Sequence, residues 1–225
     1  MKYFLIFYCL GTMSLAAQEG RYTFVFLNTN PDREELPKEQ VDSLQAGHIA
    51  NIGRLIEERK MIAAGPFHTG GGIFIFDKDK KATEAVLNSD PAIAAGRFKI
   101  ETIPFSMDMG QLCPIWDKDE SEVEMTTYFI MRFRNKFDSE GSYAMKTNRF
   151  TLDKLKEAER KLPEVQVLGD LNFDGNQGQV VIFKGDEGKM ADYEQFFKAH
   201  KGVQSGIMEF YLKQLYFAKG VFCEE

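Results

Sequence analysis

One histidine and one aspartate are the residues of this sequence best suited to acid/base chemistry. His48 lies in a stretch, residues 38–60, whose apolar residues recur every three or four positions, and it shares that apolar stripe. Burial disfavours a charged imidazolium whereas a nearby carboxylate favours it, so His48 could act as a general acid or base. Asp90, which precedes Pro91, could orient the ring and stabilise its positive form.

Each of these residues also has an ordinary structural interpretation. A histidine on an apolar stripe often ties its helix to a backbone carbonyl, and an Asp-Pro step is favourable in any turn. Gly47 and Gly53 are costly inside a helix. Either a close approach of backbone or ligand beside His48 or simple tolerance would explain them, and periodicity leaves both alternatives open.

The elements around these residues follow a β-α-β-β-α-β order. A β-rich run, a helix, two strand-like runs separated by a glycine turn, a short helix and a closing strand follow one another. The expected ranges are 22–27, 38–60, 61–67, 73–76, 82–88 and 97–106. This is the order of a ferredoxin-like sandwich.

The same order returns in the second half of the chain. The expected strands are 127–133, 165–171, 180–184 and 207–218, and the expected helices are 152–161 and 190–200, with a turn over 173–178. Shifting the sequence by 110 positions superposes Gly96 on Gly206, Gly110 on Gly220 and Cys113 on Cys223. Such a match of uncommon residue types indicates a tandem duplication.

The duplication predicts both the domains and the fold. We expect a signal peptide over 1–17, a first repeat over 18–113, an acidic connector over 114–125 and a second repeat over 126–225. Helices on one face of a four-stranded sheet leave its other face in need of a partner. We therefore expect an α+β fold in which two ferredoxin-like repeats pack face to face, as an intrachain pseudo-dimer like a dimeric α/β barrel.

The first repeat resembles the YciI-like (YCII-related) family over about residues 22–105. That family has a histidine in its first helix, an alanine-glycine-proline signature in the next strand, a glycine-rich turn and an aspartate-proline step. The matching residues here are His48, Ala64-Gly65-Pro66-Phe67, Gly70-Gly71-Gly72 and Asp90-Pro91. The resemblance implies an α/β-barrel dimer with a His–Asp active site in a pocket, and lyase-type chemistry on small organic molecules.

The resemblance assigns roles to particular residues. It implies His48 and Asp90 as the catalytic pair, with Gly65, Pro66, Phe67 and His68 as candidate pocket residues. The second repeat departs from the pattern, because no histidine occupies its first helix and His200 stands opposite Asp90. We expect the second repeat to wall the pocket rather than to supply a second site.

The remaining sequence features reduce the number of possible ligands and partners. The chain has no phosphate-binding loop, dinucleotide fingerprint or nucleophile elbow, and its three histidines lack metal-ligand spacing, so we expect no cofactor and no metal. A net charge of −6 and a pI near 5.3 disfavour nucleic acid. A small-molecule ligand and pairing of the repeats are expected, with further oligomerisation left open.

The N-terminus predicts export. Lys2, an apolar run over residues 3–10 and small residues at 14–17 have the layout of a secretory signal, and no later stretch is long and apolar enough to span a bilayer. We expect a periplasmic or extracellular protein. Cys113 and Cys223 remain after cleavage, and either a disulfide or two buried thiols would fit.

Two functions therefore remain open from the sequence. The first is an exported YciI-like enzyme or binder of a small organic molecule that uses His48 and Asp90. The second is a non-catalytic ligand-binding or structural module that retains the fold.

Overall fold

The computed structural model describes residues 22–118, 120–136, 162, 164–171 and 178–223. The expected signal peptide, the helix over 152–161 and most of the turn over 173–178 lie outside these residues. The first half holds β1 (Tyr22–Thr29), α1 (Lys38–Glu57), β2 (Ala63–Pro66), β3 (Gly72–Phe76), α2 (Lys80–Leu87), α3 (Pro91–Ala94) and β4 (Phe98–Met109). The expected order is present, with α3 as an addition that four residues were too few to predict.

The second half repeats this order in the described segments. It holds η1 (Glu120–Glu122), β5 (Met125–Asn135), β6 (Val165–Leu171), β7 (Gln179–Phe183), η2 (Glu187–Lys189), α6 (Met190–Lys198), α7 (Lys201–Gln204) and β8 (Met208–Ala218). The expected helix over 190–200 corresponds to α6, and α7 is a further short helix that was not predicted. Gly96 and Gly206 both adopt positive φ, at 64° and 75°, where α3 and α7 end.

All eight strands join in one antiparallel sheet in the order β2-β3-β1-β4-β6-β7-β5-β8. Each half contributes four strands in the same relative order, and the two halves are joined by pairing of β4 with β6. At the two free edges, Phe67 after β2 forms a bridge to Leu215 of β8. The sheet is therefore a nearly closed barrel.

This arrangement refines the expected pseudo-dimer. We expected two separate sheets packed face to face, but the halves share hydrogen bonds along their edges, and their inner faces meet across one lumen. Edge pairing satisfies backbone groups that a face-to-face sandwich would have left exposed.

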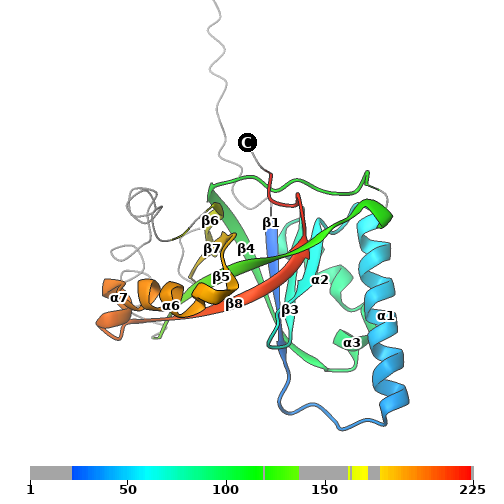
Figure 1. Cartoon of the computed structure of the whole chain (residues 1–225). Helices are drawn as coiled ribbons and strands as arrows, with labels where there is room; N and C mark the ends of the chain where they lie inside the picture. Colours follow the sequence, from blue (N-terminus) through cyan, green and yellow to red (C-terminus); the bar gives the residue numbers. More distant parts are fainter. Residues whose placement is uncertain (1–21, 119, 137–161, 163, 172–177, 224–225) are drawn as a thin grey trace, which may run out of the picture.

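The hydrophobic core has three parts. One cluster, which includes Phe24, Phe105, Ile130 and Leu215, fills the lumen and draws on both halves. The other two clusters lie on the outer faces of the barrel, one under α1 to α3 and the other under α6 and α7. Figure 1 shows these two helical layers on opposite sides of the strands.

One end of the barrel is closed by the segments that follow β4 and β8. Leu112 and Phe222 form an isolated bridge and are buried in the lumen cluster. Cys113 and Cys223 form a disulfide across the halves, with Cα atoms 5.5 Å apart. Of the two alternatives left by the sequence, the structure has the disulfide. We call residues 111–115 and 221–223 the plug; Figure 1 shows both segments over the same end of the strands.

Candidate functional site

The His48 side chain lies between α1 and the outer face of the first-half sheet. His48 is 9% exposed. Its ring stacks against Phe74 of β3 and lies tilted against Phe98 of β4, with centroids 5.7 and 5.6 Å away. The apolar stripe predicted for this helix therefore faces the sheet, and the imidazole sits in aromatic surroundings that largely exclude water.

Asp90 is the N-cap residue of α3 and is 1% exposed. Its Oδ1 accepts hydrogen bonds from the backbone N–H groups of Ala92 and Ile93, at 3.0 and 3.1 Å. Its Oδ2 lies 2.7 Å from His48 Nδ1 and accepts a longer bond from Asn51 Nδ2, at 3.4 Å. The structure thus brings the two predicted residues together, while the same carboxylate caps a helix.

The contact between His48 and Asp90 fixes which ring nitrogen carries the proton. An ionised carboxylate only accepts hydrogen bonds, so Nδ1 is the donor, and in the neutral ring Nε2 is left as an acceptor. Nε2 has no hydrogen-bond partner within the part of the chain that the structure describes. In this arrangement Nε2 can take up a proton while Asp90 stabilises the resulting cation.

A polar network behind Asp90 joins α1 to the end of α2. Arg54 Nη2 donates to Asn51 Oδ1 at 2.7 Å and to Ser89 Oγ at 3.0 Å. Asn51 in turn donates to Asp90. These bonds hold the segment that carries Asp90 against the helix that carries His48.

Gly47 allows α1 to approach α3 closely. A Cβ atom added at Gly47 would lie 2.7 Å from Pro91 Cγ, whereas one added at Gly53 would meet nothing within 4 Å. Of the two explanations left by the sequence, close approach holds for Gly47 and simple tolerance holds for Gly53. The close approach brings Pro91, and with it Asp90, against the turn of α1 that carries His48.

The two glycines give a matched pair of substitutions. We expect Gly53→Ala to raise the free energy of unfolding by about 0.5 to 1 kcal/mol, because alanine loses less conformational entropy in a helix. Gly47→Ala should lower it instead, because the rigid Pro91 ring must move away. Urea unfolding of both variants measures the difference, and equal gains at the two positions would show that α1 and α3 are not in close contact.

The candidate pocket residues lie at the seam between β2 and β8. A Cβ at Gly65 would lie 2.1 Å from the carbonyl oxygen of Tyr216, so the glycine lets the two strands approach. His68 is exposed, and its backbone N–H donates to the carbonyl of Gln214 at 3.1 Å. Pro66 is exposed as well.

Phe67 differs from the other three candidates because it points into the barrel. It is buried in the lumen cluster, and the Lys213 ammonium lies 4.6 Å from its ring centroid. These four residues therefore do not surround His48. Their role in a pocket stays a prediction, and their position in the fold is at the closure of the barrel.

A group of charged residues that was not predicted lies inside the barrel, at the end away from the plug. Arg132 of β5 is 2% exposed and forms two hydrogen bonds with Glu101 of β4, at 3.2 and 3.0 Å. Its guanidinium carbon lies 4.3 Å from the centroid of the Phe26 ring. We call the following residues the lumen charge cluster: Glu101, Arg132, Arg134, Glu209, Tyr211 and Lys213.

Burial and neighbouring charges shift the pKa values of three residues in the lumen charge cluster. Burial alone would raise the pKa of Glu101, but the hydrogen bonds and charge of Arg132 outweigh it and hold that pKa below its ordinary value. Burial raises the pKa of the Tyr211 hydroxyl, although Arg132 opposes the rise. Burial also lowers the pKa of the Lys213 ammonium, and the nearby charge of Arg134 adds to this.

A signal for this cluster was present in the sequence of β5. Residues alternate between the two faces of a strand, and Tyr128, Ile130 and Arg132 share the inward face. An arginine in phase with buried apolar residues indicates a buried charge that needs a partner. The sequence could not identify Glu101 as that partner, because it lies in the other half.

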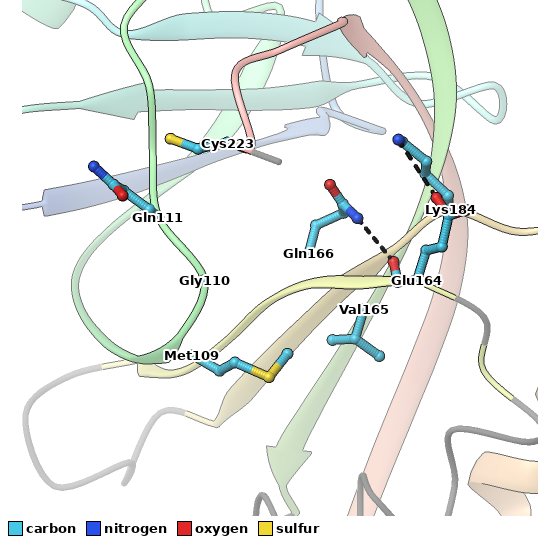
Figure 2. A pocket seen from close by; sticks show the side chains of 8 residues that line it. All are labelled: Met109, Gly110, Gln111, Glu164, Val165, Gln166, Lys184 and Cys223. Carbon is cyan, nitrogen blue, oxygen red and sulfur yellow. Dashed lines mark hydrogen bonds and ion pairs between the residues drawn. The ribbon is translucent and has the colours of Figure 1, made fainter. Parts of the chain in front are cut away.

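A cavity of about 580 Å³ opens beside the β4–β6 seam (Figure 2). Lys184 Nζ lies 3.4 Å from Glu164 Oε2, and Gln166 Nε2 donates to the Glu164 carbonyl at 3.1 Å. The cavity is lined by Met109, Gly110, Gln111, Glu164, Val165, Gln166, Lys184 and Cys223. Neither the His48–Asp90 pair nor any of the candidate pocket residues lines it.

The second half has no copy of the His48–Asp90 pair in the described residues. His200, opposite Asp90 in the 110-residue shift, caps α7 by accepting from the backbone N–H of Gly202 at 3.2 Å. His200 therefore keeps the helix-capping role of Asp90, although it is not an acid. Within the described ranges, none of the helices has the length and apolarity to cross a bilayer, and no three potential metal ligands gather.

Fold and site together define a protein of the α+β barrel class, in which one chain supplies both halves. No family model matches the chain, and no curated protein matches it. The resemblance to the YciI-like family therefore stays a prediction.

Several solved structures are similar at the level of the fold. A candidate monooxygenase from Lactobacillus acidophilus is 12% identical, with 87% of this chain and 92% of that chain covered and a TM-score of 0.41. A candidate monooxygenase from Fusobacterium nucleatum is 9% identical, with 88% and 92% covered and a TM-score of 0.42. Similarity at this level carries no argument about activity.

Proposed function

We propose that this chain is an exported protein that binds or transforms a small organic molecule, with His48 as its acid/base group and Asp90 as the residue that orients it. The 2.7 Å contact between His48 Nδ1 and Asp90 Oδ2 is the observation that carries the proposal. It leaves Nε2 as the nitrogen that can exchange a proton with a ligand. The resemblance of the first repeat to the YciI-like family supports the same pair and suggests lyase-type chemistry.

Export is part of the proposal and has two supports. The first is the signal-like layout of the N-terminal residues. The second is the disulfide between Cys113 and Cys223, since disulfides persist in oxidising compartments. N-terminal sequencing of the protein recovered from the periplasm or medium tests it, and a cytoplasmic protein that retains Met1 would contradict it.

The alternative is a module without turnover, and the bonding of Asp90 favours it. Both oxygens of Asp90 are already occupied: Oδ1 accepts from backbone N–H groups of α3, and Oδ2 binds His48 and Asn51 of α1. A carboxylate used in this way stabilises the fold whether or not chemistry takes place. The two functions differ in what the loss of His48 does.

Substitution of the pair separates the two functions. We expect the wild type to deplete one or more compounds from a mixture of small organic acids, followed by mass spectrometry. His48→Gln should abolish the depletion while the protein stays folded. Asp90→Asn, which can still cap α3, should also lose it, because a neutral amide cannot stabilise a charged ring.

Glu57, exposed at the end of α1, supplies the control. Glu57→Gln should deplete the same compounds as the wild type, because it lies on the same helix but takes no part in the His48–Asp90 contact. Imidazole ¹⁵N chemical shifts of the wild type should show the neutral His48 ring protonated at Nδ1. If the wild type depletes nothing, and His48→Gln changes only stability, the module without turnover is the correct interpretation.

A further inference from the structure

Two cationic side chains in the lumen charge cluster have donors without an acceptor. Arg132 Nε is buried and has no hydrogen-bond partner, although both terminal nitrogens of the same guanidinium bind Glu101. Lys213 has no carboxylate partner among the residues that the structure describes; its ammonium lies 4.6 Å from the Phe67 ring centroid and 5.2 Å from that of Tyr211. An unpaired donor is costly where it is buried away from water, as Arg132 Nε is, so the guanidinium favours an incoming acceptor. The Lys213 ammonium, which is partly exposed, can bind the same acceptor.

The net charge of the lumen charge cluster indicates which charge the incoming acceptor should carry. Arg132, Arg134 and Lys213 contribute three positive charges, and Glu101 and Glu209 contribute two negative ones. Tyr211 remains a neutral donor, because burial raises the pKa of its hydroxyl. One positive charge is therefore left over, which a monoanion would neutralise.

The surroundings of the unpaired donors are aromatic. Phe26 lies under the Arg132 guanidinium, and Phe67 and Tyr211 lie beside Lys213. Aromatic faces suit the apolar body of a ligand, whereas a phosphate would need more positive charge than the cluster offers.

Exposure increases from Arg132 toward the end of the barrel away from the plug. The Arg132 side chain is 2% exposed and Glu101 is 35% exposed. The Arg134–Glu209 ion pair, further along β5 and β8, is 43% and 42% exposed. The buried guanidinium thus lies behind a charged rim that solvent reaches, on the side of the lumen that the plug does not close.

Comparison of the two halves shows that these residues are specific to one of them. The 110-residue shift places Tyr211 opposite Glu101 and Lys213 opposite Ile103. Their strand partners follow: Arg132 pairs with Tyr211 in β5–β8, as Phe26 pairs with Glu101 in β1–β4. Arginine, tyrosine and lysine in the second half therefore stand where the first half has phenylalanine, glutamate and isoleucine.

We propose that the lumen charge cluster binds the carboxylate of a small aromatic or apolar organic acid, between Arg132 Nε, the Tyr211 hydroxyl and the Lys213 ammonium. The second half is then more than a wall, because it supplies the binding groups of a site in the lumen. This site lies inside the barrel, whereas His48 and Asp90 lie on its outer face. The proposal does not depend on chemistry at the His48–Asp90 pair.

Sodium benzoate at constant ionic strength is a suitable probe, with binding followed by calorimetry and by amide chemical shifts of β5 and β8. We expect saturable binding that Lys213→Met weakens by about tenfold or more, as for the loss of a charge-assisted hydrogen bond. Tyr211→Phe should weaken it to a smaller extent. Both variants should remain folded, because Lys213 is partly exposed and phenylalanine keeps the ring.

Arg132→Met should abolish binding, but it also leaves Glu101 without its partner, so the test relies on Lys213 and Tyr211. Lys219→Met is the matched control, because Lys219 follows the same strand but pairs with Glu124 at the surface. His48→Gln should bind benzoate as the wild type does, which separates this site from the proposed function.

Three results would overturn the proposal. The first is the absence of saturable benzoate binding by the folded wild type. The second is binding that Lys213→Met and Lys219→Met weaken equally, which would indicate general charge attraction. The third is binding of inorganic phosphate in place of benzoate, which would show that the site recognises a different oxyanion.

Discussion

Replacing both Cys113 and Cys223 with serine should lower the free energy of unfolding by about 4 kcal/mol. The disulfide closes a loop of 110 residues and thereby restricts the unfolded chain, for which a loop of this length corresponds to nearly 5 kcal/mol in the chain-entropy estimate. The bond also holds the plug, in which Leu112 and Phe222 are buried. Urea unfolding of the double variant against the oxidised wild type measures the loss.

Wild-type protein with the disulfide reduced is the matched control for this variant. It should unfold at nearly the same urea concentration as the double serine variant, since both lack the same covalent link. The backbone N–H of Cys113 donates to Val221 at 2.7 Å, and that of Cys223 donates to Gln111 at 3.0 Å, so the plug keeps other contacts. A loss below about 1 kcal/mol would mean that these contacts, rather than the disulfide, hold the halves together.

Gly65→Ala should lower the free energy of unfolding by about 3 kcal/mol, at the upper end of the usual cost of overpacking. The added methyl group would lie 2.1 Å from the Tyr216 carbonyl oxygen and 2.4 Å from a ring carbon of Phe217. Neither atom can yield without moving β8. The barrel should therefore open at the β2–β8 seam, which faster exchange of the His68 amide hydrogen would report.

Gly169→Ala tests the second seam in the same way. Its methyl group would lie 2.3 Å from the Ser106 carbonyl oxygen in β4. We expect a loss at least as large as for Gly65→Ala, because β4 and β6 share a hydrogen-bonded ladder. Gly53→Ala, which meets open space, is the control for alanine as such. Full stability in both seam variants would mean that the two halves are not in close contact.

Gly65 and Gly169 have a structural role that the sequence alone does not reveal. The resemblance identified Gly65 as a candidate pocket residue, but the reason for a glycine there lies in the other half of the chain. Each glycine faces the closing strand of the opposite half, Tyr216 for one and Ser106 for the other. A single sequence shows that a position lacks a side chain, but not which strand approaches it.

The local elements and the duplication could be predicted from the amino-acid sequence alone. Period-two and period-three-to-four patterns fixed most strands and helices to within a few residues, because side-chain direction follows from local backbone geometry. The 110-residue shift placed Cys113 opposite Cys223, and the family pattern singled out His48 and Asp90 before any contact was visible. The short helices α3 and α7 were not predicted, because four residues are too few to show a helical periodicity.

How the two halves pair, and which residues they enclose, could be seen only in the folded structure. The pairing of β4 with β6 and the closure of β2 on β8 are made by backbone N–H and C=O groups at the strand edges. These groups are the same in every sequence, so the residue pattern does not show which edges will pair. The burial of Arg132 against Glu101 of the other half follows from that closure. Residue types and spacing determine which face of an element is apolar, whereas the partner of that face depends on contacts between residues far apart in the chain.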